Sequence, residues 1–182
     1  MIARFAVAVF AAGMMFAANG AAQDRAPKMI DRSQARLEKE VRHEILTQPF
    51  YNVFDNVTYR VDGYTVTLMG QVTRPVLKSS IANVVKQVEG VERVDNQIEV
   101  LPLSTNDDRL RIALYRSIYG FTALQRYAMP VIQPIRIIVK NGHVTLEGIV
   151  DREADKNLAG IRANGVSGAF SVTNNLRVDK QS

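Results

Sequence analysis

Short runs of alternating apolar and polar residues recur along this chain. Residues 57–61 and 64–72 place apolar side chains on alternate positions, with Asp62-Gly63 between the two runs. A two-residue period predicts strands with one buried face, and an Asp-Gly pair predicts a tight hairpin turn. Residues 135–139 and 144–150 repeat this pattern around Asn141-Gly142. The chain is therefore expected to contain two β-hairpins.

Helical spacing appears on both sides of each hairpin. After the first hairpin, an apolar stripe predicts a helix that Thr73 caps, as Asp151 does in the second copy. Residues 33–47 and 106–119 predict a helix before each hairpin, and residues 94–100 and 172–178 return to the two-residue period of a third strand. The stripe after the first hairpin consists of Val76, Ile81, Val84, Val85 and Val88. The expected order is helix, strand, strand, helix, strand, written twice.

The two copies are also related residue by residue. VTLMGQV at 66–72 returns as VTLEGIV at 144–150, and a gapless shift of 78 residues gives thirteen identities in the forty positions from 61 to 100. Such self-similarity at one fixed spacing indicates an internal duplication. Two units of this size also fit a chain of 182 residues.

The patterns predict an α+β fold of two tandem α-β-β-α-β modules. Each module is expected to be a two-layer unit, with a small mixed three-stranded sheet covered on one face by two helices. The step from the second strand through the helix to the third strand predicts a right-handed parallel crossover. The expected modules span residues 32–103 and 104–180.

The first residues carry the pattern of an export signal. Arg4 precedes an apolar run from Phe5 to Ala18, and small residues lead to a cleavage site after Ala22. The run is short for a bilayer span, although a retained membrane anchor is the alternative interpretation. Residues 1–22 are thus expected to be a signal peptide and residues 23–31 a linker, and the mature chain is expected to have no transmembrane span.

The residue types needed for catalysis or metal binding are sparse. The chain has no cysteine, which excludes disulfides and thiolate chemistry, and its two histidines, His43 and His143, fit no metal-binding spacing. The glycines match turn, strand and cap positions, and no phosphate-binding loop is present. We therefore expect no enzyme activity, no cofactor and no metal site.

Positive charge is concentrated in the second half of the chain. Residues 30–102 hold 9 basic and 10 acidic side chains, whereas residues 103–182 hold 11 and 7. An exported protein meets anionic lipid rather than nucleic acid, so the second module is the better candidate for contact with a phospholipid surface.

A helical projection of residues 106–119 predicts an amphipathic outer surface. It directs Ile112, Tyr115 and Tyr119 away from the apolar stripe, with Arg111 and Arg116 flanking them on the outward surface. The stripe consists of Leu110, Leu114, Ile118 and Phe121. The five residues of the outward surface are the candidate lipid-binding set. Packing against the first module or a partner, and simple exposure, are the alternatives. Residues 120–134 either extend the helix to Met129 or form an apolar loop, which would fill the core or enlarge this surface.

The strand phrase VTLxGxV, followed by a helix, Gly90-Val91 and Val94-Asp95-Asn96, resembles the BON (bacterial OsmY and nodulation) domain. The resemblance covers residues 32–178, and the second copy departs from it at Gly168-Ala169 and by an insertion before Ile135. It implies a bacterial protein that is periplasmic or associated with the outer membrane, and that binds phospholipid surfaces or assists envelope integrity. The working hypothesis is an exported, non-enzymatic envelope-maintenance protein. The alternative is a periplasmic chaperone or scaffold that binds protein clients.

Overall fold

The structure is a computed structural model that describes residues 25–179, with side chains described from residue 33 onward. The chain divides into two units between Ser33 and Gln34, and both hairpins lie in the compact unit that begins at Gln34. The expected signal peptide, residues 1–22, lies outside the described residues. None of the described helices is both long enough and apolar enough to cross a membrane.

The first repeat follows the expected order of elements. Its elements are α1 (Arg25–Leu46), β1 (Asn56–Asp62), β2 (Thr65–Val72), α2 (Pro75–Gln87), β3 (Arg93–Asn96) and β4 (Glu99–Val100). Helix α1 thus includes most of the segment 23–31 that we expected to be a linker. The module boundaries themselves stay predictions.

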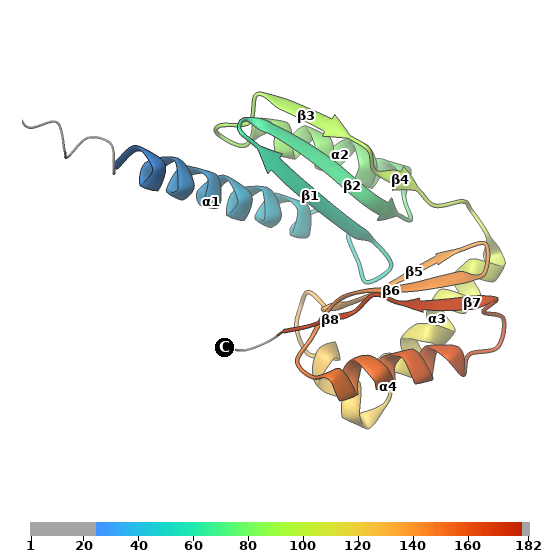
Figure 1. Cartoon of the computed structure of the whole chain (residues 1–182). Coiled ribbons are helices and arrows are strands. Elements are labelled where there is room, and N and C mark those ends of the chain that lie inside the picture. Colours follow the sequence, from blue (N-terminus) through green and yellow to red (C-terminus); the bar gives the residue numbers. More distant parts are fainter. Residues whose placement is uncertain (1–24, 180–182) are drawn as a thin grey trace, which may run out of the picture. The chain divides into compact units, whose positions relative to one another are not determined.

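The second repeat has the same order with one added element. It consists of α3 (Thr105–Tyr119), the 3-10 helix η1 (Thr122–Ala128), β5 (Ile135–Lys140), β6 (His143–Val150), α4 (Glu153–Asn164), β7 (Ser171–Asn174) and β8 (Arg177–Val178). Helices α3 and α4 cover one face of the sheet formed by β5 to β8 (Figure 1). The predicted fold class, α+β in two tandem modules, is confirmed.

The two sheets pair equivalent residues: adding 78 to the residue numbers of nearly every pair in the first sheet gives a pair in the second. In the first sheet Val57 lies opposite Gly70 in the antiparallel pair, and Val66 lies opposite Val94 in the parallel pair. The corresponding residues of the second sheet, Ile135 with Gly148 and Val144 with Val172, are paired in the same way. The duplication seen in the sequence is therefore a duplication of strand register.

Each sheet has four strands rather than the three we expected. The expected third strand is interrupted, so that β3 and β4 both pair with β2, and β7 and β8 both pair with β6. Asn96 is the last residue of β3 and directly precedes the interruption at Gln97 and Ile98. Its Nδ2 donates to Lys78 O of α2 at 2.8 Å, and its Oδ1 accepts from Ile98 N at 3.1 Å. Because the Asn96 amide has both donor and acceptor groups, it links the end of β3 to α2 and also bonds to the residue before β4.

The turns that lead into α2 and α4 are held differently from our expectation. The caps are Arg74 and Arg152, and neither makes a side-chain capping bond. Thr73 instead donates through both its N and its Oγ1 to Oδ1 of the fully buried Asp55, at 2.7 and 2.8 Å. At the equivalent place, Asp151 N donates to Tyr127 Oη at 2.9 Å. Buried partners, rather than the expected helix caps, fix both turns.

Each repeat has its own apolar core beneath its sheet. Burial of one aliphatic side chain stabilises a fold by about 1.5–3 kcal/mol, so these residues supply the main driving force. The first core includes Val41, Ile45, Val66, Leu68, Leu77, Ile81 and Ile98, and the second includes Leu114, Ile118, Leu124, Ile135, Ile137, Leu146 and Leu176.

Candidate functional site

The five residues of the candidate lipid-binding set all lie on α3, but they do not share one exposed face. Helix α3 begins after Ser104, whose Oγ accepts from Asp107 N at 3.2 Å in a side-chain cap. The structure buries two of the five side chains, leaves one half-buried and exposes the remaining two. The single amphipathic surface that we predicted is therefore divided.

Arg111 points into the second repeat rather than into solvent. Its side chain is buried, and one Nη donates to Val139 O at 2.7 Å while the other pairs with Asp108. Its Nε is the one buried side-chain nitrogen or oxygen without a partner among the described residues. Our expectation that Arg111 faces outward is wrong, because this guanidinium ties α3 to strand β5.

Tyr119 is also buried, with 3% of its surface exposed. Its hydroxyl donates to Ile135 O at 2.6 Å and accepts from Ile135 N at 3.2 Å. Burial raises the pKa of Tyr119 well above its ordinary value. The expected exposure of Tyr119 is wrong, because its hydroxyl satisfies both backbone groups of Ile135 at the start of β5.

The other three residues of the set lie nearer to solvent. Ile112 is 48% exposed and Arg116 is exposed, whereas Tyr115 is half-buried. The ring of Tyr115 stacks at a tilt on Tyr119, with 5.0 Å between the ring centroids. Ile112 and Arg116 thus keep the orientation that lipid contact needs, and their binding to lipid stays a prediction.

The outer face of α3 also packs against the segment before β1. Packing against the first module was the main alternative to lipid contact. The ring of Phe54 meets Tyr115 edge-on at 6.4 Å between centroids, and Val53 belongs to the second core. Val53 O accepts a hydrogen bond from Ile137 N at 2.9 Å. This contact takes up part of the face around Tyr115 and leaves Ile112 and Arg116 exposed.

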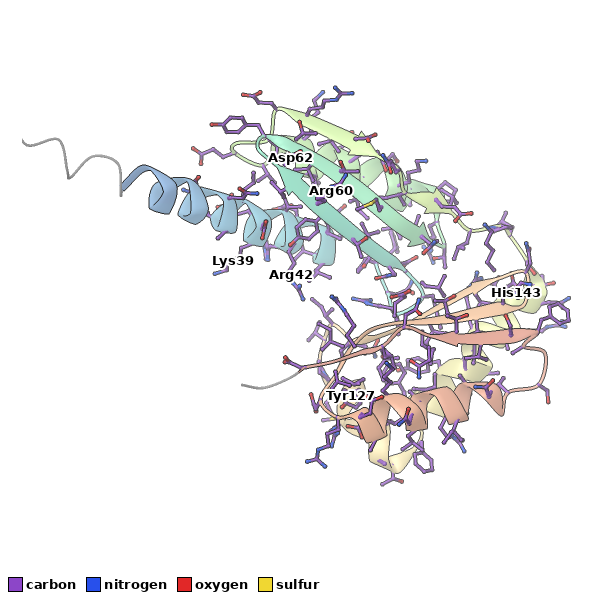
Figure 2. All side chains as sticks on the ribbon, viewed as in Figure 1. Lys39, Arg42, Arg60, Asp62, Tyr127 and His143 are labelled. Carbon is purple, nitrogen blue, oxygen red and sulfur yellow. The ribbon has the colours of Figure 1, made fainter. Side chains whose placement is uncertain are left out.

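Residues 120–134 combine the two outcomes that we had weighed. Leu124 and Tyr127 of η1 are buried in the second core. The Tyr127 hydroxyl donates to Asp155 Oδ2 at 2.8 Å and also contacts Arg126, which pairs with Asp155 and Asp151. These bonds fasten η1 to the start of α4, beside which Tyr127 is drawn (Figure 2).

The end of the same insertion is exposed and apolar. Met129 is 81% exposed, Val131 is fully exposed at 101%, and Ile132 is 42% exposed. We call these three residues the apolar loop. Gln133 Nε2 donates to Tyr115 Oη at 3.4 Å, which brings the end of this loop to the middle of α3. A long stretch before Ile135 was visible in the sequence, but its division into buried and exposed parts was not.

One pair of polar side chains has the residue types of a nucleophile and a base. His143 Nδ1 lies 2.8 Å from Ser171 Oγ. The two residues are opposite each other in the β6–β7 pair, so strand register alone brings them together. Both are exposed, and no carboxylate in the described part of the chain bonds to the His143 ring. The pair therefore lacks the orienting acid and the sheltered site of a hydrolase triad.

The histidines and carboxylates also do not gather into a metal-binding group. Across residues 33–179, no three or more His, Asp or Glu side chains are placed to hold an ion. His43 lies on α1 of the first repeat and His143 lies at the start of β6 in the second (Figure 2).

Comparison with known proteins gives one family. The family model described as the BON domain matches residues 33–102 and 125–180, which together make up more than half of the chain. No curated protein matches the sequence.

Among solved structures, two of the similar chains are of CdsD, a structural protein of the type III secretion system of Chlamydia trachomatis. One of them, the C-terminal domain, is 15% identical, with 77% of this chain and 96% of that chain covered and a TM-score of 0.27. The other is 13% identical, with 80% and 94% covered and a TM-score of 0.29.

Proposed function

This chain belongs to the BON domain family, and from that premise we propose that it is an exported, non-enzymatic envelope-maintenance protein that binds phospholipid surfaces through its second repeat. The observation that carries the proposal is the apolar loop of Met129, Val131 and Ile132. Large apolar side chains that remain in water mark contacts with membranes or partners. The proposed location is the periplasm, peripheral to the outer membrane.

The apolar loop has cationic and amphipathic neighbours that suit an anionic membrane. Ile112 and Arg116 are exposed on α3, and Gln133 joins the end of the loop to Tyr115 on the same helix. Two contributions bind a protein to such a surface. Apolar side chains enter the membrane interface, and arginines pair with the anionic headgroups. The excess of basic residues in 103–182 adds long-range attraction.

Vesicle sedimentation tests the proposal. The wild-type chain should sediment with vesicles rich in phosphatidylglycerol and much less with phosphatidylcholine alone. The double change Met129→Ser, Val131→Ser should weaken binding by about 10-fold, because two apolar side chains no longer enter the interface. Arg116→Glu should weaken binding by about 10- to 30-fold, since each charge near an anionic surface contributes about 1 kcal/mol.

Two matched controls separate this surface from general effects. Ile161→Ser removes an apolar side chain that is 67% exposed on α4, and Arg60→Glu reverses an exposed charge on β1. Both controls should bind as the wild type does. Equal binding by wild type and all variants, or no binding to anionic vesicles, contradicts the proposal.

A second candidate function is a chaperone or scaffold for protein clients. Within the described chain, β7 and β8 pair only with β6, so the other edge of both strands is open to an added strand. In that case an unfolded outer-membrane protein should be kept from aggregating by the wild-type chain, and Ser171→Pro or Thr173→Pro on β7 should reduce the effect. Client protection without binding to vesicles would favour this function over the first.

A further inference from the structure

A cleft of about 620 Å³ is lined by arginines and by no acidic residue. Arg42 of α1, Arg136 of β5 and Arg177 of β8 all contribute to its wall, and no Asp or Glu belongs to the lining in the described part of the chain. The cleft lies within the unit Gln34–Ser182. Three cations with no carboxylate among them make an electropositive recess.

Arg136 is the innermost of the three and is held in place. Its side chain is 8% exposed, Nη1 donates to Asn52 O at 2.8 Å, and the guanidinium lies over the Tyr51 ring at 4.9 Å from the centroid. No ion pair with Arg136 occurs among residues 33–179. A buried guanidinium ordinarily has an anionic partner, because desolvation of its charge is costly. Within the described residues, the Arg136 guanidinium has the Asn52 carbonyl and the Tyr51 ring as its partners, and neither is anionic.

Arg42 and Arg177 are exposed side chains at the same cleft, and Figure 2 shows Arg42 near the end of α1. Neither takes part in an ion pair within the described residues. Burial raises the pKa of Tyr51 and the charge of Asp55 adds to this rise, whereas the charges of Arg136 and Arg42 both oppose it. Arg136 and Arg42 therefore both lie close enough to the Tyr51 hydroxyl for their charges to affect its pKa.

The rest of the wall combines polar side chains, such as Asn56, Thr58 and Gln133, with apolar ones. Leu46, Val57, Ile132 and Ile149 line the cleft together with the arginines. Ile132 is also a member of the apolar loop, so the cleft adjoins the segment that we propose to enter the membrane. A ligand that matches both features has an anionic head and an apolar body.

We infer that this cleft binds the phosphate of a single anionic phospholipid molecule, held by Arg42, Arg136 and Arg177 with its acyl chains directed past Ile132. Guanidinium groups pair with phosphate oxygens through two parallel hydrogen bonds, which suits three arginines around one headgroup. The inference rests on the proposed function and adds a defined headgroup site to a general surface contact.

A soluble short-chain lipid tests the site apart from the surface. The full mature chain is titrated with dihexanoyl phosphatidylglycerol below its micelle concentration, and binding is followed by calorimetry and by amide NMR shifts. We expect saturable binding with one lipid per chain and shifts at residues of the cleft. Dihexanoyl phosphatidylcholine should bind at least about 10-fold more weakly, since its choline charge opposes the arginines.

Arg42→Gln and Arg177→Gln are the informative variants, because both side chains are exposed and their loss leaves the cores intact. Together they should weaken phosphatidylglycerol binding by about 10-fold or more. The matched control is Arg60→Gln, which removes one exposed charge that does not line the cleft and should change the affinity by less than about 2-fold.

Three outcomes would overturn the inference. They are the absence of saturable binding, an equal loss of affinity in the Arg60→Gln control, and binding of glycerol phosphate as tight as that of the lipid, which would indicate a site for phosphate alone. Vesicle sedimentation of the same proteins keeps the two proposals separate. Binding to vesicles without saturable binding of the soluble lipid removes the cleft site and leaves the surface contact standing.

Discussion

Gly70 and Gly148 occupy the same position in the central strands β2 and β6, and both have positive φ angles, of 112° and 121°. A Cβ at Gly70 would overlap the backbone oxygen of Asn56, and a Cβ at Gly148 would overlap that of Pro134. These two contacts are again 78 residues apart. The glycine in VTLxGxV therefore permits both a backbone conformation and a close approach of the neighbouring strand.

Replacement of either glycine tests this explanation. Gly70→Ala and Gly148→Ala should each lower the free energy of unfolding by about 2–3 kcal/mol, because strain and steric overlap add together. Gly63→Ala is the matched control, since Gly63 also has a positive φ of 57° but has open space around it. Gly63→Ala should lower the free energy of unfolding by about 1 kcal/mol. Urea unfolding measures all three, and equal losses would rule out the steric part of the explanation.

Asn96 and Asn174 explain another identity between the repeats. Asn174 Nδ2 donates to Lys156 O at 2.7 Å and its Oδ1 accepts from Leu176 N at 3.2 Å, as Asn96 does one repeat earlier. Asn96→Ala or Asn174→Ala should therefore destabilise the chain by about 1–3 kcal/mol, because a partly buried carbonyl and an N–H lose their partner.

Gln97→Ala is the control for the asparagine variants, since the exposed Gln97 side chain bonds only to Asp95 in the described structure. Its free energy of unfolding, measured in urea, should stay within about 0.5 kcal/mol of the wild-type value. A similar loss in Gln97→Ala and Asn96→Ala would contradict the proposed role of the asparagine bridge.

At the scale of elements, α3 shows what a helical projection can and cannot predict. Its length and its apolar stripe of Leu110, Leu114 and Ile118 were correct, since those depend on spacing alone. The exposure of Arg111 and Tyr119 was wrong, because α3 has neighbours on several sides: β5, α4 and η1. A helical projection identifies the face that packs on one neighbour, but not the faces that pack on others. Element η1 belongs to an insertion that has no counterpart in the first repeat, so comparison of the repeats does not predict its contact with α3.

The Tyr127 hydroxyl makes two of the bonds that attach η1 to the start of α4, beside the ion pairs of Arg126. Tyr127→Phe should remove the bonds to Asp151 N and Asp155 while keeping the buried ring, and so should speed amide hydrogen exchange in residues 122–128. The loss of global stability should be about 1–2 kcal/mol. Tyr64→Phe changes an exposed tyrosine and serves as the control. Unchanged exchange in Tyr127→Phe would show that ring packing and the Arg126 ion pairs hold η1 without the hydroxyl.

For the whole molecule, buried tyrosines predict a loss of stability at alkaline pH. Burial is the main cause that raises the pKa of Tyr51, Tyr59, Tyr119 and Tyr127 above the ordinary value of 10.0. The folded chain therefore holds protons that the unfolded chain releases near pH 10. Stability should be fully present below about pH 10 and should decline as the pH rises above it.

Urea unfolding between pH 8 and pH 11.5 measures this decline. Tyr119→Phe should be less stable than wild type at pH 8, since Ile135 loses its hydroxyl partner, but should show a shallower decline above pH 10. Parallel curves for the two proteins would contradict a proton retained on Tyr119.

The duplication was the part of the whole molecule that the sequence predicted best. Thirteen identities placed the strands of both sheets in equivalent positions. The contact of Val53 with β5, and the gathering of Arg42, Arg136 and Arg177 at one cleft, were not predicted. These residues lie far apart along the chain, and no periodicity relates them, so only tertiary packing brings them together.

The strand register shared by the two repeats affects how the number of modules in such a chain can change during evolution. Recombination between the two copies of the coding sequence at Val66 and Val144 would join β1 to β6 from Val144 onward without shifting any backbone pair. The shortened product would be one closed module that combines α1 with α4. Homologous exchange within this gene would thus change the number of modules while every product keeps a properly paired sheet.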